Sequence, residues 1–254
     1  MIRIADSHVH LHAYADVDGL LERAQHAGVR LIVGVSVDPA TSRETIEVAR
    51  RHVGVVAAIG LHPVHLSGPT SDATLQELHE LAQDRFVGMI GEIGLDSVDS
   101  PVSIDQQRVA FEAQLRIAKR CDLAVNLHLR GAFDEAFAIL ARVGVPNAGA
   151  VLHYFVGDET LARRALDLGL YVSVGKPVTR LENARLRDAV RIIPLDRLLL
   201  ETDSYPLPKR TTEPADVWLV ARAAGDLMGI SEAEVARVTC DNLMHLLADR
   251  APGG

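Results

Sequence analysis

The chain has 254 residues, of which 48% are hydrophobic and only 4% are aromatic. This length is enough for one large α/β domain or two small ones, and the core must consist mainly of aliphatic side chains. The formal net charge of −8 argues against a broad basic surface that grips nucleic acid. It leaves a phosphodiester substrate open, because bound cations can supply a positive field locally.

The amino-terminal segment and the cysteines bear on the location of the protein. The first ten residues contain no signal-peptide run, and no window approaches the length of a membrane span. Cys121 and Cys240 lie in helix-like stretches without a Cys-x-x-Cys motif, which predicts buried thiols in a reducing compartment. We therefore expect a cytoplasmic protein without membrane attachment, and no obligate protein partner is evident.

Strand-like and helix-like segments alternate along the whole chain. The predicted strands, in chain order, are 2–10, 30–36, 53–60, 86–91, 123–128, 148–153, 170–174 and 197–201. The predicted helices are 17–26, 42–52, 74–84, 106–120, 132–143, 159–168, 181–192, 214–228 and 232–247. The first helix illustrates the criterion, since Val17, Leu20, Leu21 and Ala24 form one apolar stripe at helical spacing.

Eight consecutive β-α repeats favour an α/β fold with a parallel sheet, and their number fits a single (β/α)8 TIM-like barrel. We expect one domain over residues 1–254, with a frayed tail at 251–254. A doubly wound open sheet is the competing fold. It usually begins with a glycine-rich first turn, whereas the first turn here is rich in histidine.

Side chains that commonly bind metals stand at or just after the ends of the predicted strands. His8 and His10 are two residues apart, so on a strand they point to the same face. The others are His62, Glu92, His128, His153 and Asp203. In a barrel the carboxyl ends of all strands meet at one mouth, where the active site lies. Because imidazole and carboxylate hold divalent cations, the pattern predicts a polynuclear metal site.

Each of these residues also has a structural interpretation. Glu92 could pair with an arginine at the edge of the core, and Asp203 could cap the helix that follows. A lone histidine at a strand end is more often hydrogen-bonded than metal-bound. The repetition at equivalent strand ends favours the metal. No Gly-x-Ser-x-Gly or His-Glu-x-x-His motif competes with it.

Several motifs together carry a family resemblance that runs nearly end to end. They are DSHVHL at 6–11, GLHP at 60–63, GEIGLD at 91–96, LHLR at 127–130, LHYF at 152–155 and ETDS at 201–204. The chain resembles the TatD-like metal-dependent deoxyribonucleases of the amidohydrolase superfamily. Asn242 also falls where that family keeps an asparagine.

The resemblance implies a barrel with two, sometimes three, divalent ions that activate a water for phosphodiester hydrolysis, often exonucleolytic, in DNA. One ion would be held by His8, His10, Glu92 and Asp203. The other would be held by Glu92, His128 and His153, with Glu92 bridging. His62 would face the phosphate, Arg130 would contact the substrate, and Asp203 would take the proton of the water. The sequence does not choose among Zn, Mn and Mg.

The departures from the family pattern lie around the substrate. His12 replaces an aspartate, Gly131 replaces another, and Val156 stands where a small hydroxyl residue is usual. A second hypothesis therefore keeps the barrel and the metals but assigns a small phosphoester, amide or lactone as substrate. A third, a metal-binding scaffold without catalysis, is disfavoured because the ligand set is complete.

Overall fold

The computed structural model describes residues 3–207 and 210–250. The strands are β1 Ile4–Val9, β2 Val29–Val35, β3 Val55–Ile59, β4 Val87–Asp96, β5 Ala124–Arg130, β6 Ala150–Leu152, β7 Tyr171–Val174 and β8 Leu198–Leu200. A small antiparallel pair, β9 Pro206–Leu207 and β10 Arg210–Thr211, was not expected from the sequence. Strands β1 to β8 follow one another in chain order in the sheet, as the β-α alternation predicts.

The helices separate the strands as expected. They are α1 Val17–His26, α2 Pro39–Arg51, α3 Asp72–Leu81, α4 Ile104–Cys121, α5 Phe133–Val143, α6 Glu159–Asp167, α7 Ala184–Ile192, α8 Val217–Met228 and α9 Glu232–Leu247. In the part of the chain that the structure describes, no helix has both the length and the hydropathy that crossing a bilayer requires. The predicted strand start at residue 2 and the predicted frayed tail lie outside the described residues.

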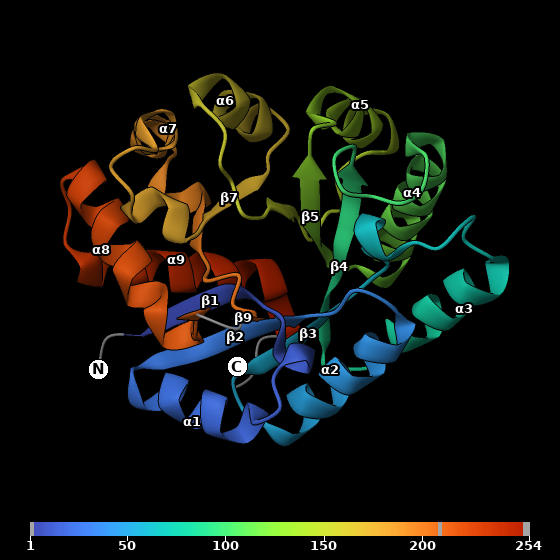
Figure 1. Ribbon diagram of the computed structural model, residues 1–254, viewed down its shortest axis with the longest axis horizontal. Coiled ribbons are helices and arrows are strands. Elements are labelled where there is room, and N and C mark those ends of the chain that lie inside the picture. The colour runs from blue at the N-terminus through green and yellow to red at the C-terminus, as the bar shows by residue number, and fades with distance from the viewer. Residues whose placement is uncertain (1–2, 208–209, 251–254) are drawn as a thin grey trace. The chain divides into compact units, whose positions relative to one another are not determined.

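The chain divides into two compact units, which are described separately. The first unit contains the chain up to Gly34 together with Tyr154–His245, and the second contains Val35–His153 and the chain from Leu246. In the first unit β1 pairs with β2 and β7 with β8, all parallel. In the second unit β3, β4, β5 and β6 pair in order, with α4 and α5 packed beside β4 and β5 (Figure 1). A single domain over 1–254 stays a prediction.

Aliphatic residues fill the core, as the composition predicts. All ten residues of β4 and all five of β3 are buried, which is typical of parallel strands covered on both faces. Helix α4 turns one face inward and buries Phe111, Leu115 and Ile117. Ser103 begins this helix with a capping box that includes Gln106.

Strand β4 is longer than predicted, and this changes the position of Glu92. The expected end was Gly91, but β4 continues to Asp96 because its second half pairs with β5. Gly94 lies opposite His128, where an added Cβ would come within 1.9 Å of the His128 carbonyl oxygen. Only glycine fits there, and a glycine in mid-strand reads from the sequence as a strand end. Glu92 therefore lies inside the strand and not after it.

Helices α2, α3, α4, α5, α7 and α8 begin one to three residues away from their predicted starts, and α2 and α7 illustrate the causes. Helix α2 begins at Pro39 and not at residue 42, because Asp38 and Thr41 form a capping box and proline is favoured in the first helical turn. Helix α7 begins at Ala184 and not at residue 181, since a 3-10 turn, η3 Lys176–Thr179, precedes it. These shifts leave the order of elements unchanged.

The two thiols differ in exposure, so the prediction of two buried cysteines holds for Cys240 but is wrong for Cys121, which is partly exposed. Burial raises the pKa of Cys240 to about 11 and also raises the pKa of Cys121. At pH 8 about one in a thousand Cys240 side chains would be thiolate, the reactive form. We expect Ellman's reagent to label Cys121 first and Cys240 only on unfolding. Fast labelling of both thiols in the native protein would contradict this.

Candidate metal centre

In the first unit, His8, His10 and Asp203 come together. His8 and His10 face each other with their Nε2 atoms 3.4 Å apart, and Asp203 Oδ1 lies 3.8 Å from the first and 3.4 Å from the second. The expectation that both histidines share one face is met. Donors around a tetrahedral ion with bonds of about 2.0–2.1 Å are separated by about 3.4 Å. These three atoms therefore have the spacing of metal ligands.

Backbone pairing explains why residues so far apart in sequence meet here. The Asp203 N–H donates to the His8 carbonyl, and the His10 N–H donates to the Ser204 carbonyl. Asp203 has a left-handed backbone with φ of 48°, which aspartate adopts more readily than most residues. The turn after β8 thereby directs this carboxylate toward His8 in β1 and His10 just after it.

Asp6 links the end of β1 to the segment after β8 through its side chain. Its carboxylate accepts hydrogen bonds from the hydroxyl and the N–H of Thr202, and from the N–H of His8. Desolvation raises the pKa of Asp6 to about 8, although these hydrogen bonds lower it. Glu201 is also buried and accepts the N–H of Tyr154 at 2.7 Å. These acidic groups position the strand ends.

In the second unit, three imidazoles surround the carboxylate of Glu92. Its Oε1 atom lies 2.7 Å from His153 Nε2, 2.8 Å from His128 Nδ1 and 3.4 Å from His62 Nε2. Glu92 is 1% exposed, so an ionised carboxylate here needs positive partners. The partners in this unit are histidines.

His128 is held between two carboxylates. Its Nε2 atom lies 2.9 Å from Asp96 Oδ2, while its Nδ1 atom faces Glu92. Desolvation raises the pKa of the Asp96 carboxyl, but hydrogen bonds from the Asp99 and Val98 N–H groups and from His128 outweigh it, so the pKa lies below its usual value. The ionised Asp96 favours the tautomer with the proton on Nε2. The Nδ1 lone pair then points at Glu92.

This arrangement fits a divalent cation. With the proton of His128 on Nε2, its Nδ1 atom and Glu92 Oε1 are both acceptors, yet they lie 2.8 Å apart. Only a proton or a cation between the two atoms makes such an approach favourable. The carboxylate and imidazole donors suit Zn or Mn better than Mg. The set of donors therefore agrees with the metal that the motifs predict.

His62 differs from the other histidines in the direction of its proton. The Val64 N–H donates to His62 Nδ1 at 3.0 Å, so a neutral ring carries its proton on Nε2. Burial lowers the pKa of His62, which favours the neutral ring. Its Nε2–H is directed toward Glu92 and His128. His62 thus presents a hydrogen-bond donor and not a lone pair, as a phosphate-binding role requires.

Strand β5 continues two residues past the predicted end at His128 and ends at Arg130, whose guanidinium pairs with Asp99 at 2.7 Å. Both side chains are at least half exposed, so solvent weakens this pair and the arginine can exchange partners at low cost. The pairing of Asp99 with Arg130 was not expected from the sequence. A substrate anion would have to compete with this carboxylate.

The positioning contacts of Asp6 and Asp96 were also not predicted from the sequence. Asp96 could have been found, because Glu92, Gly94 and Asp96 alternate along one strand and so share one face. Asp6 gave no such signal, since its partner Thr202 lies 196 positions away.

We expect Asp96→Asn to weaken metal binding by about 10- to 100-fold, the effect typical of losing the carboxylate behind a ligating histidine. The amide would keep the hydrogen bonds from Val98 and Asp99 but would no longer favour the proton on His128 Nε2. Chelator competition measures the affinity, and thermal unfolding of the metal-free protein controls for folding. Asp105→Asn, at a side chain that is 75% exposed, is the matched control. Equal affinities of both variants and the parent would disprove the role of Asp96.

Known proteins of one family match the chain over nearly its whole length. The chain matches the sequence model of the family described as TatD related DNase over residues 5–248. It is 34% identical to the uncharacterized metal-dependent hydrolase YcfH of Escherichia coli (strain K12), with 97% of each chain covered. It is also 34% identical to the 3'-5' ssDNA/RNA exonuclease TatD of Klebsiella pneumoniae (strain 342), covering 79% of this chain and 80% of that one.

A solved structure gives the same result for the fold. The crystal structure of YJJV, a TatD homolog from Escherichia coli K12, matches with a TM-score of 0.89 and 30% identity, covering 96% of this chain and 98% of that one. The predicted (β/α)8 barrel is thereby confirmed, and the doubly wound alternative is excluded.

Proposed function

Because the chain belongs to the TatD related DNase family, we propose that it hydrolyses phosphodiester bonds of nucleic acid with two divalent ions. One ion would be held by His8, His10 and Asp203, with Glu92 as the shared ligand. The other would be held by Glu92, His128 and His153. The barrel supports this assignment, since the carboxyl ends of its strands form one active-site face.

One observation carries the proposal most directly. His128 Nδ1 and His153 Nε2 both lie within 2.8 Å of Glu92 Oε1, so two imidazole nitrogens share one carboxylate oxygen. Asp96 orients His128 from behind. A buried carboxylate with two such neighbours is a costly arrangement for stability alone, but it suits a bridging metal ligand.

When bound, the two ions lower the pKa of water from near 16 to about 7 and neutralise charge on the phosphate oxygens. The side chains supply the remaining functions. His62 donates its Nε2–H to a nonbridging phosphate oxygen, and Arg130 leaves Asp99 to form charge-assisted hydrogen bonds with the phosphate. Asp203 orients the attacking water and accepts its proton.

Three observations bear on the substrate. The name of the Klebsiella relative, a ssDNA/RNA exonuclease, supports a nucleic acid. The net charge of −8 and the departures at His12, Gly131 and Val156 favour a small phosphoester, or an amide or lactone. The two free thiols support a cytoplasmic location as part of the proposal.

Metal removal and reconstitution test the proposed function. The chain is freed of metal with a chelator and reloaded with Mn, Mg, Zn or Co. Turnover is then measured on bis(p-nitrophenyl) phosphate and on end-labelled single-stranded DNA. We expect both to be cut only after reloading. Cutting of the small diester alone would retain the metal chemistry and reject DNA. If the metal-loaded protein cut neither substrate, the phosphodiesterase proposal would be rejected, and amides and lactones would be the next substrates to test.

A further inference from the structure

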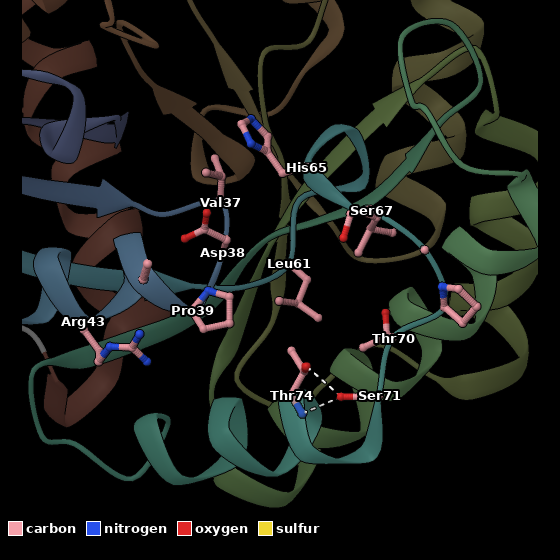
Figure 2. A pocket seen from close by; sticks show the side chains of 14 residues that line it. Val37, Asp38, Pro39, Arg43, Leu61, His65, Ser67, Thr70, Ser71 and Thr74 are labelled. Atoms are coloured by element: carbon pink, nitrogen blue, oxygen red, sulfur yellow. Dashed lines mark hydrogen bonds between the residues drawn. The ribbon is translucent and has the colours of Figure 1, made fainter.

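The second unit contains a pocket of about 480 Å³ whose lining includes His65. Its walls come from the segments that lead into α2 and α3 and from the first turns of these helices. Figure 2 shows His65 on one side of the pocket and Ser71 and Thr74 on the opposite side, with Leu61 between them. Small-molecule sites are typically clefts of about 300–1,000 Å³ with a few polar groups on apolar walls, and this pocket has that character.

A short path of rings joins the pocket to the metal centre. The His65 ring lines the pocket and lies edge-on to the His62 ring, with centroids 5.5 Å apart. His62 Nε2 in turn lies 3.4 Å from Glu92 and 3.3 Å from His128. A substrate whose phosphate reaches His62 would therefore have its next chemical group at the pocket.

The charges on the pocket wall disfavour an anion as its occupant. Arg43 and Asp38 both line the pocket and carry opposite formal charges. Arg43 forms an ion pair with Glu77. The two helix N-termini at the pocket already have side-chain caps, Asp38 for α2 and Ser71 for α3. A second phosphate would find no free positive field here, whereas a neutral, hydrogen-bonding group would fit.

One polar atom on the wall lacks a partner. Thr70 Oγ1 is buried, and it has no hydrogen-bond partner among the described residues. Such groups are rare and costly in folded proteins unless a ligand or water satisfies them. Pro39 and Pro69 supply apolar surface nearby. The pocket thus combines apolar faces with an unused hydroxyl, a combination that suits a ring with polar edges.

We propose that this pocket binds the nucleoside next to the phosphate that is cut, with its base between the apolar walls and its polar edge at Thr70 and the neighbouring hydroxyls. This inference rests on the proposed function and specifies it, since it makes a nucleotide, and not a simple phosphoester, the preferred substrate. His62 marks the boundary between the two parts of the site.

Gly68 allows the pocket to be filled without disturbing the backbone. It lines the pocket, and an added Cβ would meet no atom within 4 Å. Gly68→Phe therefore places a ring at the pocket without a steric clash of its Cβ atom. Val53→Phe is the matched control, because Val53 is 97% exposed in the same unit and does not line the pocket. Thr70→Val removes the unpaired hydroxyl while keeping the shape of the side chain.

Two substrates separate the pocket from the chemistry. The first is thymidine 5′-(p-nitrophenyl phosphate), which carries a nucleoside, and the second is bis(p-nitrophenyl) phosphate, which does not. We expect Gly68→Phe to lower the ratio of their kcat/KM values at least tenfold and Thr70→Val to lower it severalfold, with Val53→Phe at the parent ratio. If the ratio of the two kcat/KM values were the same in Gly68→Phe and Val53→Phe, the nucleoside-binding role of the pocket would be rejected. The proposed phosphodiesterase activity would stand.

A binding measurement keeps the inference testable if the proposed function fails. Thymidine is titrated into the metal-free protein, and the backbone amide shifts of residues 65–74 are followed by NMR. We expect saturable shifts there that Gly68→Phe abolishes and Val53→Phe retains. If the parent cuts neither substrate, the phosphodiesterase proposal fails, and this titration alone decides the pocket. Absence of shifts in the parent protein would overturn the nucleoside site whatever the activity.

Discussion

Replacing Glu92 by glutamine is expected to abolish phosphodiester hydrolysis, with a loss of at least about 10³-fold in turnover, because the activation of water that we propose would depend on both ions. The amide keeps the size of the side chain but removes the charge that draws His128, His153 and the ions together. Metal content should fall for both sites at once, since Glu92 is proposed as their shared ligand. Turnover of bis(p-nitrophenyl) phosphate and metal analysis after dialysis measure the two effects.

The matched control for Glu92→Gln is Glu159→Gln, on a carboxylate that is 49% exposed and paired with Arg163 across one helical turn. It should retain both metal and turnover. Folding of Glu92→Gln is checked by circular dichroism and thermal unfolding without metal. A folded Glu92→Gln protein that still binds two ions would show that this residue does not bridge them.

Asp203→Asn is expected to lower turnover by about 10²- to 10⁴-fold, the range for loss of a positioned general base. The backbone should tolerate the change, because asparagine also adopts the left-handed conformation that Asp203 has at φ 48°. Unlike Glu92→Gln, this variant should keep the ion that Glu92, His128 and His153 are proposed to hold. Metal stoichiometry, measured beside turnover, therefore separates the two residues.

Asp188→Asn, at a carboxylate that is 57% exposed on α7, is the control for Asp203→Asn. The pH profile adds a readout that a structural role would not change, since the acidic limb of kcat should disappear with the general base. A folded Asp203→Asn protein with unchanged turnover would reject the assignment of Asp203.

Much of the fold was readable because it depends on local pattern. Buried parallel strands appear as short aliphatic runs, helices as stripes at 3.6-residue spacing, and their strict alternation restricts the topology to a few choices. The same logic placed His8, His10, His128, His153 and Asp203 at strand ends, where a barrel brings functional residues to one face. The predicted end of β4 at Gly91 was wrong, because the strand continues through Gly94, where the missing side chain allows close approach to His128.

The sequence by itself determined the kinds of donor atom and the strands that carry them. Only the tertiary structure decided which atom faces which. The register of β4 against β5 places Asp96 at the Nε2 atom of His128 and Glu92 at its Nδ1 atom. The hydrogen bond from the Val64 N–H to His62 Nδ1 leaves the proton of a neutral His62 on Nε2, which faces Glu92. Asp6 meets Thr202 across 196 positions. These contacts depend on strand register and long-range pairing, for which no local periodicity provides a signal.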